Sequence, residues 1–292
     1  MRWVVGWAVK TDARVMNTTI QKAFYRNGQL REQVPMRNGR RHGVVRTWHK
    51  NGGLATEEIY RNDLLNGICR QWDETGRLLG KYEMVDGTGV QRTWHDNGQI
   101  QLEVSTVRGQ FCGRNRLWLR DGTLISERFY LHGQIVNAAA YCAAAAKDRM
   151  LPRFRGKPTK LAPDNARTQR RIHRVFVSSL LAKPCRREAR IWMQKANSDN
   201  AARTLGRFKR QNDAVKFVSR LYRAGAVDVI APDIYRDTAG NEFADGLIVR
   251  LGKVAARRKA VRHVCAQLRR RRLGAVQPDD DMGETHLYLS MT

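Results

Sequence analysis

The chain is poor in several features that would assign its class at once. Its five cysteines are scattered over 292 residues without a C-x-x-C pair, which argues against a disulfide framework or a zinc site. No segment approaches the ~18 consecutive apolar residues of a membrane helix. The opening residues, MRWVVGWAV, lack the small-residue cleavage site of a signal peptide. We therefore expect a cytoplasmic protein.

Catalytic signatures are missing as well. No G-x-S-x-G, Walker loop or H-E-x-x-H motif occurs. His49 and His95 each follow a tryptophan at the same place in a repeated motif, so they belong to the repeat rather than to an active site. His263 and Cys265 would lie about 200° apart on a helix and could not pair. We predict no enzymatic activity, no cofactor, no metal ion and no small-molecule substrate.

Acidic residues are few, and this shortage is the most unusual bulk property. The sequence has 54 Lys+Arg against 27 Asp+Glu, which gives a formal net charge of +27. Such a charge attracts nucleic acid, anionic lipid or acidic protein. The alternative interpretation is a solvated arginine surface that needs no partner.

What the sequence does contain is a period. The pattern G-x4-W-x3-G-x-[LI] occurs four times, and an earlier half-copy, FYRNGQL, places Phe24 in the tryptophan position. The steps from Trp48 to Trp72, then to Trp94 and to Trp118, are 24, 22 and 24 residues. A fixed period in this range indicates a repeat architecture.

Each unit is predicted to be a β-hairpin. The stretch VVRTW alternates so that Val44, Arg46 and Trp48 share one face, and the Asn-Gly that follows favours a tight turn. One such hairpin is marginal in water. We therefore expect the units to stack into one antiparallel sheet, in which the recurring tryptophans pack as an aromatic spine.

These motifs resemble MORN-type repeats, in the variant found in bacterial proteins described as YwqK-family antitoxins. The resemblance covers about residues 21–136, with two departures: Asp63 replaces a glycine, and the third unit is shortened to YEMVDGTG. It implies a long single-layer antiparallel sheet, binding to proteins or lipids, and no catalysis.

The expected fold class is a multi-domain β plus α/β protein, with an elongated hairpin array followed by a small α+β domain. Helix formers in NAAAYCAAAAKD would cover the open edge of the last hairpin. Later segments predict a helix capped by Asn212, two strands, a basic helix from Val254 to about Arg272, and the strand ETHLYLSM. The predicted domains are an N-terminal extension (1–20), the repeats (21–136), a capping helix with a basic linker (137–170) and a basic α+β domain (171–292).

The first candidate site is a ladder of arginines beside a ladder of tryptophans. Each arginine stands two residues before a tryptophan and is expected on the same sheet face. Such a face would bind carboxylates or phosphates; alternatively, the arginine stems only shield the indoles from water. The predicted partner-binding residues are Arg46, Arg70, Arg92, Arg116, Trp48, Trp72, Trp94 and Trp118.

The second candidate site is the basic helix. Four consecutive arginines near its C-terminus exceed what the helix dipole accounts for, so a polyanion-binding patch competes with a solvated face as the interpretation. The carboxylates of the nearby PDDDMGE segment would either pair with these arginines or hold a cation, and the segment lacks the spacing of an EF-hand, which argues against the cation. The predicted polyanion-binding residues are Arg257, Arg258, Lys259, Arg262, Arg269, Arg270, Arg271 and Arg272.

Together these features predict a non-enzymatic interaction protein whose repeat sheet binds an acidic partner protein. The resemblance implies that the partner is a toxin. The alternative is a nucleic-acid-binding protein that acts through residues 147–210, with 19 Lys/Arg against 4 Asp/Glu, and through the basic helix. A third hypothesis is binding to an anionic membrane surface.

Overall fold

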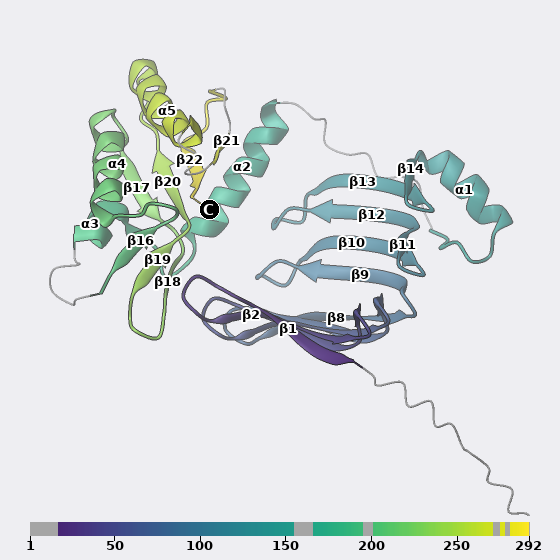
Figure 1. Cartoon of the computed structure of the whole chain (residues 1–292). Helices are drawn as coiled ribbons and strands as arrows, with labels where there is room; N and C mark the ends of the chain where they lie inside the picture. The colour runs from purple at the N-terminus through teal and green to yellow at the C-terminus, as the bar shows by residue number, and fades with distance from the viewer. Residues whose placement is uncertain (1–16, 155–165, 195–200, 271–274, 278–280, 292) are drawn as a thin grey trace, which may run out of the picture.

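The protein consists of a large antiparallel sheet followed by a smaller α/β unit, with helix α2 (Ala166–Leu181) between them (Figure 1). The structure is a computed structural model, and it describes residues 17–154, 166–194, 201–270, 275–277 and 281–291. All five cysteines are unpaired. None of the helices within these ranges combines the length and the apolar character needed to cross a membrane.

The predicted hairpin array is confirmed as one 14-stranded sheet, ordered β1-β2-β4-β5-β7-β8-β9-β10-β12-β13-β14. The short strands β3, β6 and β11 pair with β2, β5 and β10. The array begins slightly before the predicted limit at residue 21. Its strands are β1 (Thr18–Phe24), β2 (Leu30–Arg37), β3 (Arg40–Arg41), β4 (Gly43–Trp48), β5 (Leu54–Arg61), β6 (Leu64–Leu65), β7 (Gly67–Trp72), β8 (Leu78–Val85), β9 (Thr88–Trp94), β10 (Ile100–Val107), β11 (Gln110–Phe111), β12 (Gly113–Trp118), β13 (Leu124–Leu131) and β14 (Gln134–Val136).

The turns between units explain why glycine recurs. At the turn after β2, Asn38 and Gly39 have φ angles of 51° and 75°. Positive φ at both central residues is the turn geometry that matches the twist of a hairpin. Asp63, which departs from the glycine pattern, also has a positive φ of 71°. Its carboxylate accepts a hydrogen bond from the backbone N–H of Arg41 at 2.9 Å, so the departure ties two neighbouring units together.

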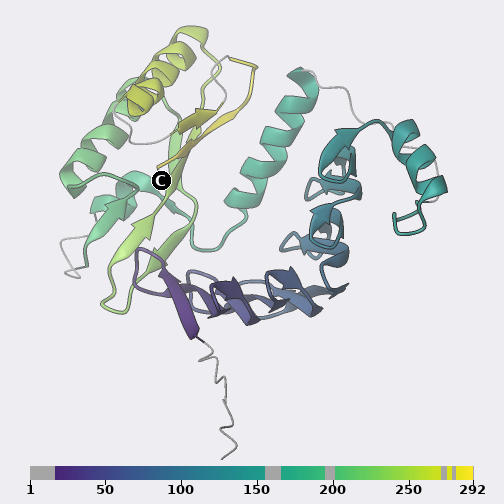
Figure 2. The same ribbon diagram turned by 45° about the vertical axis from the view of Figure 1, so that its right-hand side comes forward.

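The shortened third unit is where the sheet bends. Figure 2 shows the array as two limbs that meet near β8 and β9, and these strands pair at two positions next to their turn. Farther from the turn, Trp94 packs over Gly80, where an added Cβ atom would lie 2.2 Å from the indole. The Gln71 amide bonds the backbone N–H and C=O of Trp94 at 3.0 and 2.9 Å. A side chain thereby takes the place of the missing strand partner.

A helix covers the far end of the array. Helix α1 (Ala138–Lys147) is capped by Asn137, whose side chain accepts a hydrogen bond from the Ala140 N–H at 2.8 Å. Its Tyr141 is fully buried, with ring centroids 5.7 Å from Phe129 and 5.8 Å from Phe154. The predicted helix therefore packs on the last hairpin through an aromatic cluster.

The C-terminal unit contains two small sheets, ordered β15-β17-β20-β22-β21 and β16-β19-β18. Its core is apolar and includes the fully buried Leu221, Leu247 and Leu287. Its elements are β15 (Arg187–Glu188), α3 (Ala189–Gln194), β16 (Arg203–Leu205), α4 (Gln211–Arg223), β17 (Asp228–Ala231), β18 (Ile234–Arg236), β19 (Glu242–Ala244), β20 (Gly246–Arg250), α5 (Ala255–Arg270), β21 (Ala275–Gln277) and β22 (His286–Ser290).

Some details of the sequence predictions for this part were wrong. The predicted cap Asn212 lies inside the first turn of α4, because the helix begins at Gln211, and Arg210 at the N-cap makes no side-chain capping bond. Helix α2 crosses the predicted boundary at residues 170 and 171. Strands β15, β16, β18, β19 and β21 were not predicted, because two or three residues are too few to show alternation.

Candidate interaction surface

The arginine ladder of the repeats is organised by glutamates. Glu57 on β5 lies opposite Arg46 on β4 and opposite Arg70 on β7. Arg46 Nε donates to Glu57 Oε2 at 3.0 Å, and Arg70 Nη1 donates to Glu57 Oε1 at 3.3 Å. We call these three residues the Glu57 triad.

The second limb repeats this arrangement. Glu103 on β10 lies opposite Arg92 and Arg116 and bonds them at 2.9 and 2.5 Å; these three residues form the Glu103 triad. Burial alone would raise the pKa of Glu103, but hydrogen bonds from Arg92 and then Arg116 outweigh burial and hold the pKa below its usual value. The Glu103 carboxylate is therefore charged, and the formal charge of two arginines and one glutamate gives each triad one net positive charge.

The triads remain accessible although they are paired. The four arginine side chains are 24–39% exposed, and a guanidinium group has five N–H donors, more than a single glutamate uses. Neither glutamate belongs to the G-x4-W motif, so the motif alone does not reveal them. The sequence could have revealed them by their position, since each glutamate lies in the second strand of a hairpin, opposite the arginine of the first strand.

The tryptophans hold equivalent positions but do not form the predicted continuous spine. Each is the last residue of its strand, next to a shift in register. Trp94 is buried and stacks on Tyr82 with a centroid separation of 6.4 Å, whereas Trp48, Trp72 and Trp118 are half-buried. Within the described residues no two of these four indoles form a ring contact. Hydrogen bonds from side chains join the units instead.

Hydrogen bonds that repeat with the units link their tryptophan-side turns. His49 Nε2 donates to the carbonyl of Trp72 at 2.9 Å, and His95 Nε2 donates to that of Trp118 at 3.0 Å. Asn51 donates to the carbonyl of Glu74 in the same way, at 2.8 Å. These contacts assign both histidines to the repeat scaffold, as their position after tryptophan predicts.

Three segments of the array match a known repeat family. A family profile described as "MORN repeat variant" matches residues 18–38, 41–62 and 88–107. These segments are similar to MORN repeats. MORN repeats are in general non-catalytic modules for protein or membrane interaction. The comparison with curated proteins gives no match. The hairpins β7–β8 and β12–β13, which the profile does not match, repeat the same topology in the MORN-like array.

The basic helix α5 uses two of its predicted polyanion-binding residues internally. Arg258 Nε donates to Asp281 Oδ2 at 2.7 Å, and Arg262 pairs with Glu284. The hydrogen bond from Arg258 holds the pKa of Asp281 well below its usual range. This confirms that the acidic segment pairs with the helix. Arg257 and Lys259 are exposed; Arg269 and Arg270 end α5, and Arg271, Arg272, Asp279 and Asp280 lie outside the described residues.

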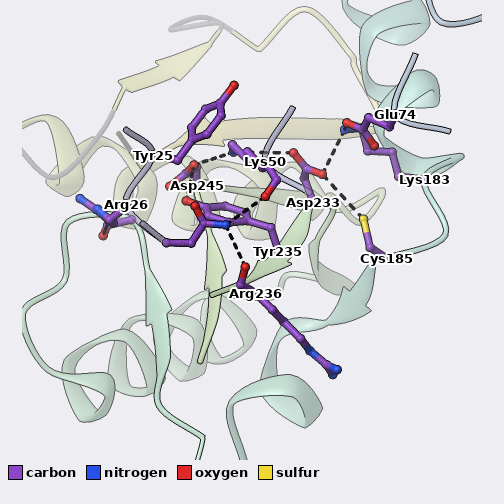
Figure 3. A network of polar contacts seen from close by, with 12 residues as sticks. Tyr25, Arg26, Lys50, Glu74, Lys183, Cys185, Asp233, Tyr235, Arg236 and Asp245 are labelled. Carbon is purple, nitrogen blue, oxygen red and sulfur yellow. Dashed lines mark hydrogen bonds and ion pairs between the residues drawn. The ribbon is translucent and has the colours of Figure 1, made fainter. Parts of the chain in front are cut away.

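The turns of the array are bonded to the C-terminal unit through ion pairs (Figure 3). Lys50 Nζ lies 2.7 Å from Asp245 and 3.9 Å from Asp233. Lys183 bridges Asp233 at 3.0 Å and Glu74 at 3.2 Å. Burial alone would lower the pKa of Lys183, but Asp233 raises it above its usual value. We call Lys50, Glu74, Lys183, Asp233 and Asp245 the lysine latch, because they join sequence-distant parts of the chain at the hairpin turns of the array.

Proposed function

We propose that this chain is a non-catalytic interaction protein whose MORN-like array binds a partner protein through the face of the two triads. The observation that carries the proposal is the pairing of four accessible arginines by Glu57 and Glu103. Shared glutamates hold the guanidinium groups in place, so less rotamer freedom is lost when a partner carboxylate binds them. The general role of MORN repeats in interaction supports the same conclusion.

The partner in this proposal is acidic, because each triad keeps a net positive charge and unused N–H donors. The resemblance to YwqK-family antitoxins narrows the partner further, to a toxic protein that the array neutralises. Half-buried Trp48, Trp72 and Trp118 at the strand ends add the aromatic surface that is enriched at protein interfaces. The nucleic-acid alternative has weaker support, since Arg258 and Arg262 already pair with carboxylates.

The test compares two double variants with the same change in charge. Arg70→Gln with Arg92→Gln removes one arginine from each triad, whereas the control, Arg40→Gln with Arg61→Gln, changes exposed arginines at the opposite turns. Partners captured from host extract by the wild type are identified by mass spectrometry and purified, and their affinity is then measured by calorimetry. We expect the triad variant to bind at least about 10-fold more weakly, or ~1.4 kcal/mol, and the control to bind normally.

Equal affinities for the wild type and the triad variant would overturn the triad face as the binding surface. Equal losses in both double variants would assign the interaction to the overall charge. Flotation with anionic vesicles and gel shifts with duplex DNA are run on the same variants. If the wild type binds the vesicles or the DNA more tightly than it binds any captured protein, the proposal is replaced by a membrane or a nucleic-acid function.

A further inference from the structure

A second candidate site lies where three parts of the chain meet. A cavity of about 1020 Å³ is bounded by the turn between β12 and β13, by helix α2 and by residues 283–286 before and within β22. Small-molecule pockets occupy ~300–1,000 Å³. The volume is at the top of that range, which favours a polypeptide segment over a metabolite.

One wall of the cavity is a stripe of arginines. Arg167, Arg170, Arg171 and Arg174 on α2 all line the cavity. Their spacing is i, i+3, i+4 and i+7, which places them on one face of the helix. All four side chains are exposed.

Helix formation does not account for this stripe. It occupies the N-terminal half of α2, and the first turn of the helix contains no acidic residue. The helix dipole disfavours positive charge at this end. Like charges at i, i+4 are also destabilising, by ~0.2–0.5 kcal/mol per pair in isolated helices. The arginines are therefore placed against the local preferences of the helix, as expected where a ligand uses them.

The charges that line the cavity do not balance. Among the described residues, the acidic ones that line it are Asp121 and Glu284. Arg171 bonds Asp121 at 3.0 Å, and Glu284 pairs with Arg262 of α5. Arg170 donates to the carbonyl of Met282 at 3.0 Å, a neutral acceptor. Within the described residues, Arg170 and Arg174 therefore have no carboxylate partner.

The rest of the lining combines apolar side chains with the polar residues Thr123, Thr168, His173, Ser178, Thr285 and His286. Leu119 and Ile125 come from the array, and Ile172, Val177 and Leu181 come from α2. Guanidinium groups beside aliphatic side chains match a ligand that has carboxylates and apolar groups along the same chain. A nucleic acid would offer phosphates but no aliphatic side chains.

We propose that this arginine-lined cavity binds an acidic segment of a partner polypeptide that also carries apolar side chains. Carboxylates of the segment pair with Arg170 and Arg174, and its apolar side chains pack on Leu119 and Ile125. The site is distinct from the triads, so the proposed function does not depend on it.

The experiment uses full-length protein and a fluorescent copolymer of glutamate and leucine as the probe. Binding is measured by fluorescence anisotropy at 0.15 M salt, with a thymidine oligonucleotide of equal charge as the second probe. Arg170→Gln with Arg174→Gln is the test variant, and Lys216→Gln with Arg223→Gln, exposed positions on α4, is the matched control. We expect the test variant to bind the copolymer about 10-fold more weakly and the control to stay within about 2-fold of the wild type.

Three outcomes would overturn the proposal: no copolymer binding by the wild type, equal losses in the two variants, or an oligonucleotide affinity that falls as much as the copolymer affinity. The single variant Arg174→Gln guards against misfolding, because within the described chain this side chain makes no hydrogen bond or ion pair. It should retain the melting temperature of the wild type and show part of the loss in affinity.

Discussion

The two triad glutamates offset the electrostatic repulsion among the four arginines of the ladder. Four arginines placed on neighbouring strands of one sheet repel one another, and like charges opposite each other on a sheet are destabilising. Glu57 and Glu103 convert that repulsion into ion pairs across three strands each. They therefore both stabilise the sheet and orient the arginines for a partner.

Replacing Glu103 with glutamine should lower the free energy of unfolding by about 1–2 kcal/mol at pH 7. The side chain is 11% exposed and bonds both Arg92 and Arg116, but these arginines can recover some of the loss by turning to water. Urea denaturation measures the change. The matched variant Glu57→Gln should lose less, because Glu57 is 20% exposed.

The same variant gives a pH test with a defined sign. The folded-state pKa of Glu103 lies below its usual value, so its stabilisation is present above about pH 4.3 and is lost as the pH falls through the folded pKa. The stability difference between wild type and Glu103→Gln should therefore shrink as the pH is lowered from 5 towards 3. A difference that stays constant over this range would show that Glu103 does not act through its charge.

At the scale of the element, the straight parts of the array follow from the sequence and the bend does not. Alternation and Asn-Gly turns are local signals, and they predict hairpins because register and turn type are fixed within a few residues. The bend depends on Trp94 meeting Gly80 and Gln71, which lie in strands of the preceding unit. The shortened third unit is visible in the sequence, but the partners of Trp94 are set by packing between strands.

The Glu–Arg triads and the arginine-lined cavity were likewise only partly predictable from the sequence. The ladder of arginines was predicted from the period alone, whereas the pairing by Glu57 needs the register between neighbouring hairpins. The arginine stripe of α2 has a clear i, i+3, i+4, i+7 spacing in RTQRRIHR. Its facing wall comes from the β12–β13 turn, more than 40 residues earlier in the chain, which no local pattern indicates.

Gly80→Ala tests the bend directly. An added Cβ atom would lie 2.2 Å from the Trp94 indole, and overpacking of this kind typically costs about 1–3 kcal/mol. The expected result is a lower urea midpoint and a changed tryptophan emission spectrum. Gly252→Ala is the control, because its nearest neighbour is a methyl group at 3.6 Å; similar losses in both variants would contradict a specific role for the Gly80–Trp94 contact.

At the scale of the whole molecule, charge decides how the two parts are held together. The chain carries a net charge of +27, which favours expansion through self-repulsion. The lysine latch opposes that repulsion locally by placing Lys50 and Lys183 among three carboxylates at the edge of the array. Lys50 also lies over the Tyr235 ring, 4.1 Å from its centroid. These contacts act beside the hydrogen bonds of Arg26 and Asn27 to the carbonyls of Gly206 and Arg236, and we expect the lysines to contribute a salt-sensitive part of the association.

The double variant Lys50→Gln with Lys183→Gln should loosen the C-terminal unit from the array. Each lysine loses partly buried carboxylate partners, and Asp233 is left between two neutral amides. Small-angle scattering should show a larger radius of gyration than in the wild type. Salt should have the same effect on the wild type, since the screening length falls from ~10 Å at 0.1 M to ~3 Å at 1 M.

The control variant is Lys81→Gln with Lys216→Gln, two exposed positions with the same charge change, and it should leave the radius of gyration unchanged. If the latch variant stays as compact as this control at every salt concentration, the two parts are held by other contacts, such as the hydrogen bond from the Asn27 amide to the Arg236 carbonyl at 2.8 Å, rather than by the lysines.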